Sequence, residues 1–191
     1  VWSLCLGCAG AARRRRRGRL LACSGFSQAG FILAPLAVVG QIGSTTLTSV
    51  VTYLLIYAAM NLGAFTVVMA VARRTGSAEI TSFAGLFNYA PSLAVLMSLF
   101  LFSLAGIPPL GGWLAKFVAF RAVIDAGTPW AYTLAVVMAV NSVIALFYYA
   151  NVARQMWMQP VPDDDRTPVR IPPALTASLA LFGVGHVAAA L

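Results

Sequence analysis

A break in an apolar helical pattern stands out in the stretch Leu101-Phe-Ser-Leu-Ala-Gly-Ile-Pro-Pro-Leu-Gly-Gly-Trp-Leu-Ala-Lys-Phe117. The helix-breaking residues within it are Gly106, Pro108, Pro109, Gly111 and Gly112. The two prolines remove two backbone donors, and the glycines loosen the chain on both sides, so we expect carbonyls near the break to lack helical partners. The only lysine of the chain, Lys116, follows Gly112 by four residues. The predicted helix break therefore lies about one helical turn from the only lysine of the chain.

The composition predicts an integral membrane protein. Of the 191 residues, 60% are apolar and only 9% are charged, and the mean hydropathy is +0.85. These values lie outside the range of ordinary soluble domains. We therefore expect an all-α polytopic membrane protein in contact with the lipid bilayer.

Apolar runs long enough to cross about 30 Å of hydrocarbon predict one membrane domain over residues 1–191. The predicted spans lie near residues 20–40, 47–72, 91–126, 131–153 and 171–191. Residues 1–12 are too short to span alone and are interpreted as the end of a truncated helix, and residues 13–19 as a basic cytoplasmic loop. About six transmembrane helices result, one of them discontinuous at residues 106–112.

The basic residues predict the orientation. Eleven of the thirteen Arg and Lys residues lie in alternate connections, at residues 13–19, at Arg73 and Arg74, and at Arg154, Arg166 and Arg170. The positive-inside rule makes these connections cytoplasmic and the C-terminus external, in the plasma membrane of a bacterial cell. The net charge of +8 then describes a topology, and no nucleic-acid partner is expected, because such a partner would require these charges on one soluble face.

The same rule favours a single, interrupted crossing for residues 91–126. As one straight helix they would measure roughly 54 Å, so two crossings are the alternative, but these would place Arg154, Arg166 and Arg170 outside. A broken helix is tolerated in a membrane only where protein or water surrounds the break, and such helices mark binding or conduction sites in transporters.

Lys116 is the first candidate for function. A charge at membrane depth costs about 2.5–3.5 kcal/mol on insertion scales, so we expect a partner, water or a use for it. Burial disfavours the ammonium, whereas water or a carboxylate favours it, and a lysine held between these effects can load and release a proton. The alternative is that Lys116 extends to the outer surface from the end of a shorter span. Arg121 and Asp125, spaced i, i+4, predict a salt bridge near the outer end.

Polar stripes on the other spans supply candidate water-chain neighbours of Lys116. Gln28 shares a helix face with Ser24 and Ser27, and Asn141 aligns with Tyr148. Tyr53, Tyr57 and Asn61 recur every four residues. Packing between helices is the alternative and more frequent role, since polar side chains in lipid must find hydrogen-bond partners in any case.

The sequence predicts no metal or cofactor site in this chain. Cys5 and Cys8 have redox-motif spacing but lack a second cysteine pair or a nearby histidine. No phosphate-cradling glycine loop or dinucleotide fingerprint is present. Any redox reaction must therefore belong to partners.

Four blocks of the sequence resemble subunit N of the proton-pumping NADH-quinone oxidoreductase, respiratory complex I. They are residues 19–31, 53–65 and 101–117 and the stretch Asn141-Ser-Val-Ile-Ala-Leu-Phe-Tyr-Tyr149. Met60-Asn61-Leu62-Gly63 favours subunit N over its antiporter-like sister subunits. The resemblance covers nearly the whole chain and corresponds to the C-terminal half of that subunit.

The resemblance implies an inverted-repeat fold of fourteen membrane helices, of which this chain supplies roughly the last six. It places Lys116 on the lysine of the family's broken twelfth helix, which is thought to be the outer terminus of a buried proton path coupled to quinone reduction. It also implies other membrane subunits of complex I as partners, with NADH, FMN, iron–sulfur clusters and quinone on partner subunits.

The chain departs from the family pattern in two respects that bear on function. Gln28 replaces a histidine often seen in its helix; it can hydrogen-bond water but cannot carry charge. The glutamate and two lysines that the family places on earlier helices lie in a region that this sequence lacks. A related cation/proton antiporter, a membrane hydrogenase subunit and a non-functional fragment with a structural role are the alternatives, and the sequence is equally compatible with a partial sequence, a degenerate copy or one piece of a split subunit.

Overall fold

The structure, a computed structural model, describes residues 17–38, 44–76, 81–108 and 110–161, together with residues 176, 177, 179–181 and 183. Over these ranges the chain contains helices and no strand, which confirms the predicted all-α fold class. The principal helices are α2 (Arg17–Leu36), α4 (Ser44–Thr75), α6 (Pro91–Ala105), α7 (Gly111–Ile124) and α8 (Pro129–Met158). A 3-10 turn, Thr81–Phe83, and the short α5, Leu86–Tyr89, precede α6.

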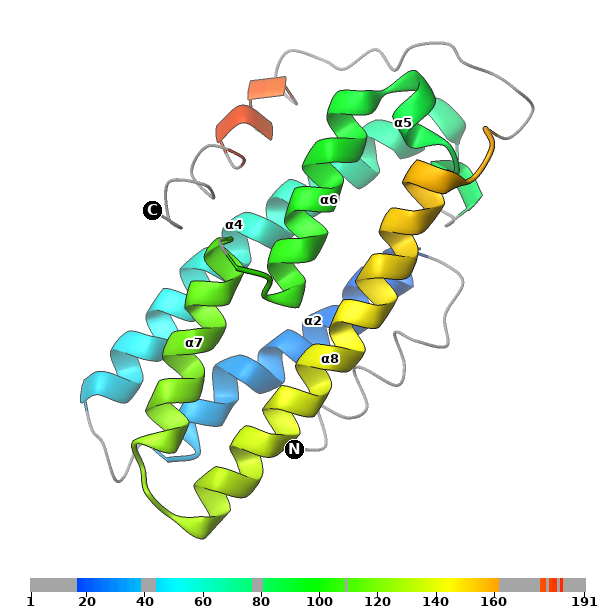
Figure 1. The fold of residues 1–191 in the computed structure, drawn as a ribbon. Helices are drawn as coiled ribbons and strands as arrows, with labels where there is room; N and C mark the ends of the chain where they lie inside the picture. The colour runs from blue at the N-terminus through cyan, green and yellow to red at the C-terminus, as the bar shows by residue number, and fades with distance from the viewer. Residues whose placement is uncertain are drawn as a thin grey trace.

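The helices form an elongated bundle in which α6 and α7 follow one another alongside the two long helices α4 and α8 (Figure 1). Together α6 and α7 cover about the length that α4 covers alone. Within the described ranges, α4 from Thr46 onward and α8 are the two helices that are long and apolar enough to cross a membrane unaided. The arrangement fits one crossing divided between two half-helices, although the number of crossings stays a prediction.

Local sequence explains where α8 and α6 begin and where α6 ends. Thr128 lies in extended backbone, its Oγ1 accepts a hydrogen bond from the Ala131 N–H at 3.3 Å, and Pro129 occupies the first helical position. Pro91 likewise opens α6. Gly106 ends α6 with a φ of +90°, a left-handed conformation that glycine adopts without steric cost.

The helix bounds differ from the predicted spans by a few residues. The helix α2 begins at Arg17, inside the stretch predicted as a loop. The backbone break covers residues 106–110, since Gly111 and Gly112 already belong to the first turn of α7. Residues 1–12, Pro109 and nearly all of the predicted span 171–191 lie outside the described residues.

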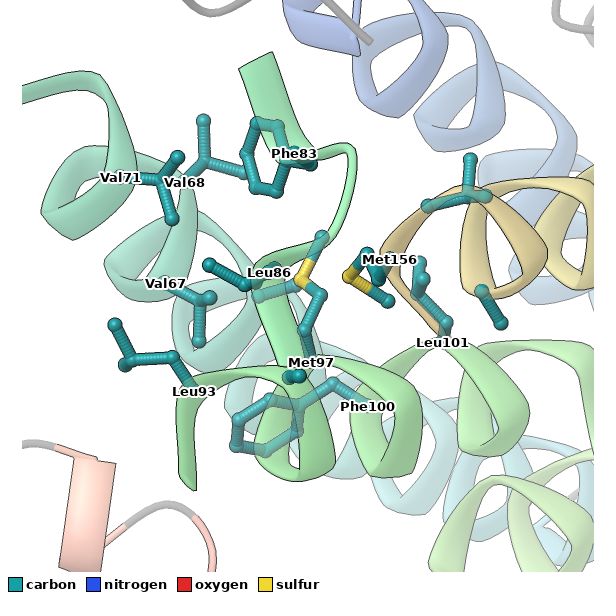
Figure 2. Close-up of a cluster of buried hydrophobic side chains, with 14 of the residues drawn as sticks. Val67, Val68, Val71, Phe83, Leu86, Leu93, Met97, Phe100, Leu101 and Met156 are labelled. Carbon is teal, nitrogen blue, oxygen red and sulfur yellow. The ribbon is translucent and has the colours of Figure 1, made fainter. Parts of the chain in front are cut away.

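Two apolar clusters occupy the bundle, and the break lies between them. The larger joins α4, the 3-10 turn, α5, α6 and α8 (Figure 2), through Val67, Val68, Val71, Phe83, Leu86, Leu93, Met97, Phe100, Leu101 and Met156. The smaller joins α2, α4, α7 and α8, through Phe31, Ala34, Val38, Tyr53, Ala115, Ala119, Val123, Ala131, Leu134, Ala135 and Met138. Each half-helix is therefore anchored in its own apolar cluster, and the break lies between the two clusters.

Close approach of α4 to α6 depends on Gly63. A Cβ at this position would lie inside contact distance of the Phe100 ring, which is fully buried. We expect Gly63→Val to destabilise the protein by about 1–3 kcal/mol, as overpacked cores do. The measurement is the thermal denaturation of the detergent-solubilised protein. Ala58→Val, on an exposed position of the same helix, is the matched control, and equal effects of the two variants would contradict the prediction.

Candidate functional site

Lys116 lies in the first half of α7 and reaches back across the break. Its side chain is buried, with 6% of its surface exposed. Helical side chains tilt toward the N-terminus of their helix, and Lys116 Nζ accordingly donates a 2.7 Å hydrogen bond to the carbonyl of Ala105, the last residue of α6. The lysine therefore joins the two half-helices, and its nitrogen lies at the break.

The bond to Ala105 belongs to a set of contacts that satisfies the end of α6. The last four carbonyls of a helix have no partner within it. Two of those of α6 accept from backbone N–H groups of the break at 2.8–3.1 Å. The carbonyl of Leu104 accepts from Gln28 Nε2 at 3.1 Å. With Lys116 on Ala105, side chains from two other helices complete the set, so the structure brings Gln28 and Lys116 to consecutive carbonyls.

The surroundings of Lys116 Nζ suit a positive charge. The C-terminal end of a helix carries a negative partial charge, and α6 presents this end to the ammonium. The centre of the Phe31 ring lies 4.9 Å from Nζ, within the range of cation–π attraction. An ammonium in this position is thus offered a carbonyl, a helix dipole and a ring face, which together offset part of the cost of burial.

Glycines make room for this arrangement on both sides of the break. A Cβ added to Gly106 would lie 2.7 Å from Lys116 Cδ, so the lysine stem occupies the place that a larger residue would fill. A Cβ at Gly112 would collide with the carbonyl of Ser103. The Gly112 N–H instead donates to Ser103 Oγ at 2.9 Å, and this hydroxyl contacts Met60 Sδ on α4 at 3.0 Å. The break is closely packed rather than open.

Gln28 is held from a third helix by Tyr53, which the sequence does not predict as a site residue. The Tyr53 hydroxyl, on α4, donates a 2.5 Å hydrogen bond to Gln28 Oε1, and both side chains are buried. Tyr53 belongs to the predicted stripe with Tyr57 and Asn61, so the four-residue spacing is the signal that could have indicated it.

The other predicted neighbours of Lys116 occupy different places. Asn141, on α8, is buried, and its Nδ2 donates to the carbonyl of Val137 in its own helix at 2.8 Å. Tyr57 is partly buried and packs against both apolar clusters. Asn61 is partly buried one turn further along α4. Gln28 thus donates to a carbonyl at the break, whereas the Asn141 amide donates within its own helix.

A groove of about 460 Å³ opens between the first turns of α4 and the second half of α7. It is lined by Thr48, Ser49, Phe117, Val118, Arg121, Ala122 and Asp125. Arg121 Nε and Asp125 Oδ2 are 3.6 Å apart, which confirms the predicted i, i+4 salt bridge. Both side chains are largely exposed, so the pair contributes little to stability. Within the described part of the chain, no group of three or more His, Cys, Asp or Glu residues is placed to hold a metal ion.

Comparison with known proteins shows the family. Residues 1–144 match the family model described as NADH:quinone oxidoreductase/Mrp antiporter, TM. NADH-quinone oxidoreductase subunit N 2 of Sorangium cellulosum is 42% identical over 153 residues, which are 80% of this chain and 30% of that protein. Subunit N of Chloroflexus aggregans is 37% identical over 190 residues, 99% of this chain and 37% of that protein. The chain therefore spans about a third of the length of these relatives.

Solved structures show the same fold. A chain of respiratory complex I from Thermus thermophilus with bound aureothin superposes with a TM-score of 0.81 and 26% identity, covering 100% of this chain and 41% of that one. A chain of the Mrp complex from Dietzia sp. superposes with a TM-score of 0.84 and 24% identity over 98% of this chain and 42% of that one, which shows a shared fold. The extent of the family match and the identity to subunit N relatives confirm the resemblance found in the sequence, and the chain belongs to the transmembrane family of NADH:quinone oxidoreductase and Mrp antiporter subunits.

Proposed function

We propose that this chain acts within a proton-translocating membrane subunit of an NADH-quinone oxidoreductase, in which Lys116 takes up and releases the transported proton. The observation that carries the proposal is the buried Lys116 ammonium on the Ala105 carbonyl, at the end of an interrupted helix. Family membership and the names of its relatives, subunit N, support the biological setting.

The chemistry needed at this position is reversible protonation in a protected site. Lysine can lose its proton, whereas arginine remains charged in proteins. The carbonyl, helix end and ring face around Nζ stabilise the protonated form, and burial opposes it. The protonated form of Lys116 is thus both stabilised and destabilised by its surroundings. A change elsewhere in the complex that altered this balance could drive proton uptake or release.

The proposed path continues along the polar stripes of the bundle. We assign Tyr57, Asn61 and Asn141 to a hydrated route toward Lys116, with Gln28 at the break itself. The proposal puts the end of α4 and α8 that carries Arg73, Arg74 and Arg154 on the cytoplasmic side, and the positive-inside rule supports this. The C-terminus is then external in the bacterial plasma membrane.

The driving reaction belongs to partner subunits in this proposal. NADH oxidation, quinone reduction and the flavin and iron–sulfur chemistry would take place there, and other membrane subunits would complete the proton path. An Mrp-type cation/proton antiporter subunit is the second candidate, since a chain of an Mrp complex shares the fold. The identity of 37–42% to subunit N relatives favours the oxidoreductase.

Replacing Lys116 with alanine tests the proposal directly. In the assembled complex that contains this chain, Lys116→Ala should slow NADH-driven proton translocation by about 100-fold, the lower end of what a positioned proton carrier contributes. Acidification of inverted membrane vesicles measures the rate, normalised to the amount of complex. Normal translocation by a normally assembled variant would rule out the carrier role.

Lys116→Arg separates charge from proton exchange. The guanidinium preserves the positive charge at the end of α6 but does not release a proton. We expect complex assembly near the level of the unmodified protein together with translocation as slow as in Lys116→Ala. If Lys116→Arg pumped normally in the same vesicle assay, the charge alone would suffice and proton release from this residue would be excluded.

Gly106→Ala tests whether proton translocation depends on the space that Gly106 leaves for the Lys116 side chain. The added methyl meets Lys116 Cδ and also forces an L-residue into a φ of +90°, which costs about 1–2 kcal/mol. Gly127→Ala is the matched control, because its φ is +66° and nothing lies within 4 Å of the added Cβ. We expect the vesicle assay to show slower translocation for Gly106→Ala than for Gly127→Ala; equal rates would mean that the glycine serves the turn and not the lysine.

A further inference from the structure

Tyr53 makes two contacts that lead to Lys116 by separate routes. It lies on α4 with 2% of its surface exposed. Its hydroxyl donates to Gln28 Oε1, and its ring lies nearly parallel to that of Phe31, at an interplanar angle of 6° and a centroid distance of 6.3 Å. Gln28 and Phe31 are three residues apart on α2 and share one face of that helix. One tyrosine therefore contacts two residues of α2 that lie at the break.

Two contacts hold the Gln28 amide from opposite sides. The Leu104 carbonyl can only accept, so the amide nitrogen faces it, and the Tyr53 O–H donates to the amide oxygen on the other side. The opposite orientation would set the amide oxygen against a carbonyl oxygen, two acceptors with no proton between them. The Leu104 carbonyl is thus occupied, and the adjacent carbonyl of Ala105 is the one that Lys116 uses.

The ring contact determines where the second partner of the ammonium lies. Phe31 is fully buried, and its ring centre is 4.9 Å from Lys116 Nζ. Cation–π attraction requires the cation near the ring face within about 6 Å, so a tilt of Phe31 would remove it. The Tyr53 ring, on α4, stacks on the Phe31 ring, on α2, and thereby limits that tilt.

We infer that Tyr53 is a positioning residue for Lys116, holding the Leu104 carbonyl through Gln28 and the ring face through Phe31. The inference rests on the proposed function and adds to it a residue that does not touch the lysine. A buried tyrosine whose hydroxyl merely finds a partner is the competing explanation. The two differ in consequence: positioning affects proton transfer per complex, whereas simple packing affects only how much complex assembles.

The test uses the assembled complex in inverted vesicles, with NADH-driven proton translocation normalised to complex content. Tyr53→Phe removes the hydroxyl and keeps the ring, and should slow translocation about three- to tenfold, the equivalent of one hydrogen bond. Tyr53→Leu removes both contacts and should slow it further. Replacement of Tyr53 by para-aminophenylalanine returns a donor to the same place and should restore the rate. Tyr132→Phe, on an exposed position of α8, should leave the rate unchanged.

Gln28→Leu removes the acceptor of the Tyr53 hydrogen bond. It provides a second measurement if Tyr53→Phe assembles poorly. It should match Tyr53→Phe in rate, and the double variant should lose no more than either single one. In a Lys116→Ala background, Tyr53→Phe should have no further effect. An unchanged rate per complex in both Tyr53→Phe and Gln28→Leu would overturn the inference while leaving the role of Lys116 intact. Normal translocation by Lys116→Ala would instead overturn the proposed function, and the inference with it.

Discussion

The hydrogen bond from Lys116 to the Ala105 carbonyl is the interaction on which the site depends. A helix that ends inside a bundle exposes carbonyls that must be paired, because an unpaired buried acceptor costs about 1–3 kcal/mol. A lysine buried in an apolar chain has the complementary need for acceptors. At the break each group offsets part of the cost of the other, since the ammonium donates the hydrogen bond that the carbonyl needs. Neither group would be stable there without the other or an equivalent partner.

The packing of the bundle maintains this pairing. α6 is anchored in the larger apolar cluster and α7 in the smaller one, so the two half-helices have separate supports. A side chain at Gly112 would meet the Ser103 carbonyl, so this glycine sets how closely the two halves approach. Gly106 leaves room for the Lys116 stem. The two glycines therefore contribute to the geometry of the break and not through any chemistry of their own.

Much of this arrangement follows from the sequence, and the remainder depends on tertiary contacts. The position of the break could be predicted because proline and glycine act locally on the backbone. The interest of Lys116 was also evident, since a lone charge in an apolar span is costly. The acceptor on Ala105 was not predictable, because it depends on how α7 lies against α6. Tyr53 was placed in a stripe but not in the site, since a four-residue spacing identifies a helix face and not its partner.

The short elements before α6 illustrate a different limit. The 3-10 turn at Thr81–Phe83 and the four-residue α5 are too short to show a hydrophobic period, which needs a window of about 11 residues or more. By contrast, the start of α2 at Arg17 was missed because the run of arginines was assigned to a loop by charge alone. A helix that starts in the basic run is compatible with the positive-inside prediction, since that rule concerns the side of the membrane and not the backbone conformation.

The end of α6 and the start of α7 meet at the break with opposite partial charges, and this explains the direction in which Lys116 points. The N-terminal end of α7 is positive and repels an ammonium, whereas the C-terminal end of α6 attracts it. Lys116 is long enough to pass the first and reach the second. A charge-assisted hydrogen bond is about twice as strong as a neutral one, so loss of the proton would weaken the bond from Lys116 to the last residue of α6. Under the proposed function, the proton occupancy of Lys116 and the geometry of the break would therefore be coupled.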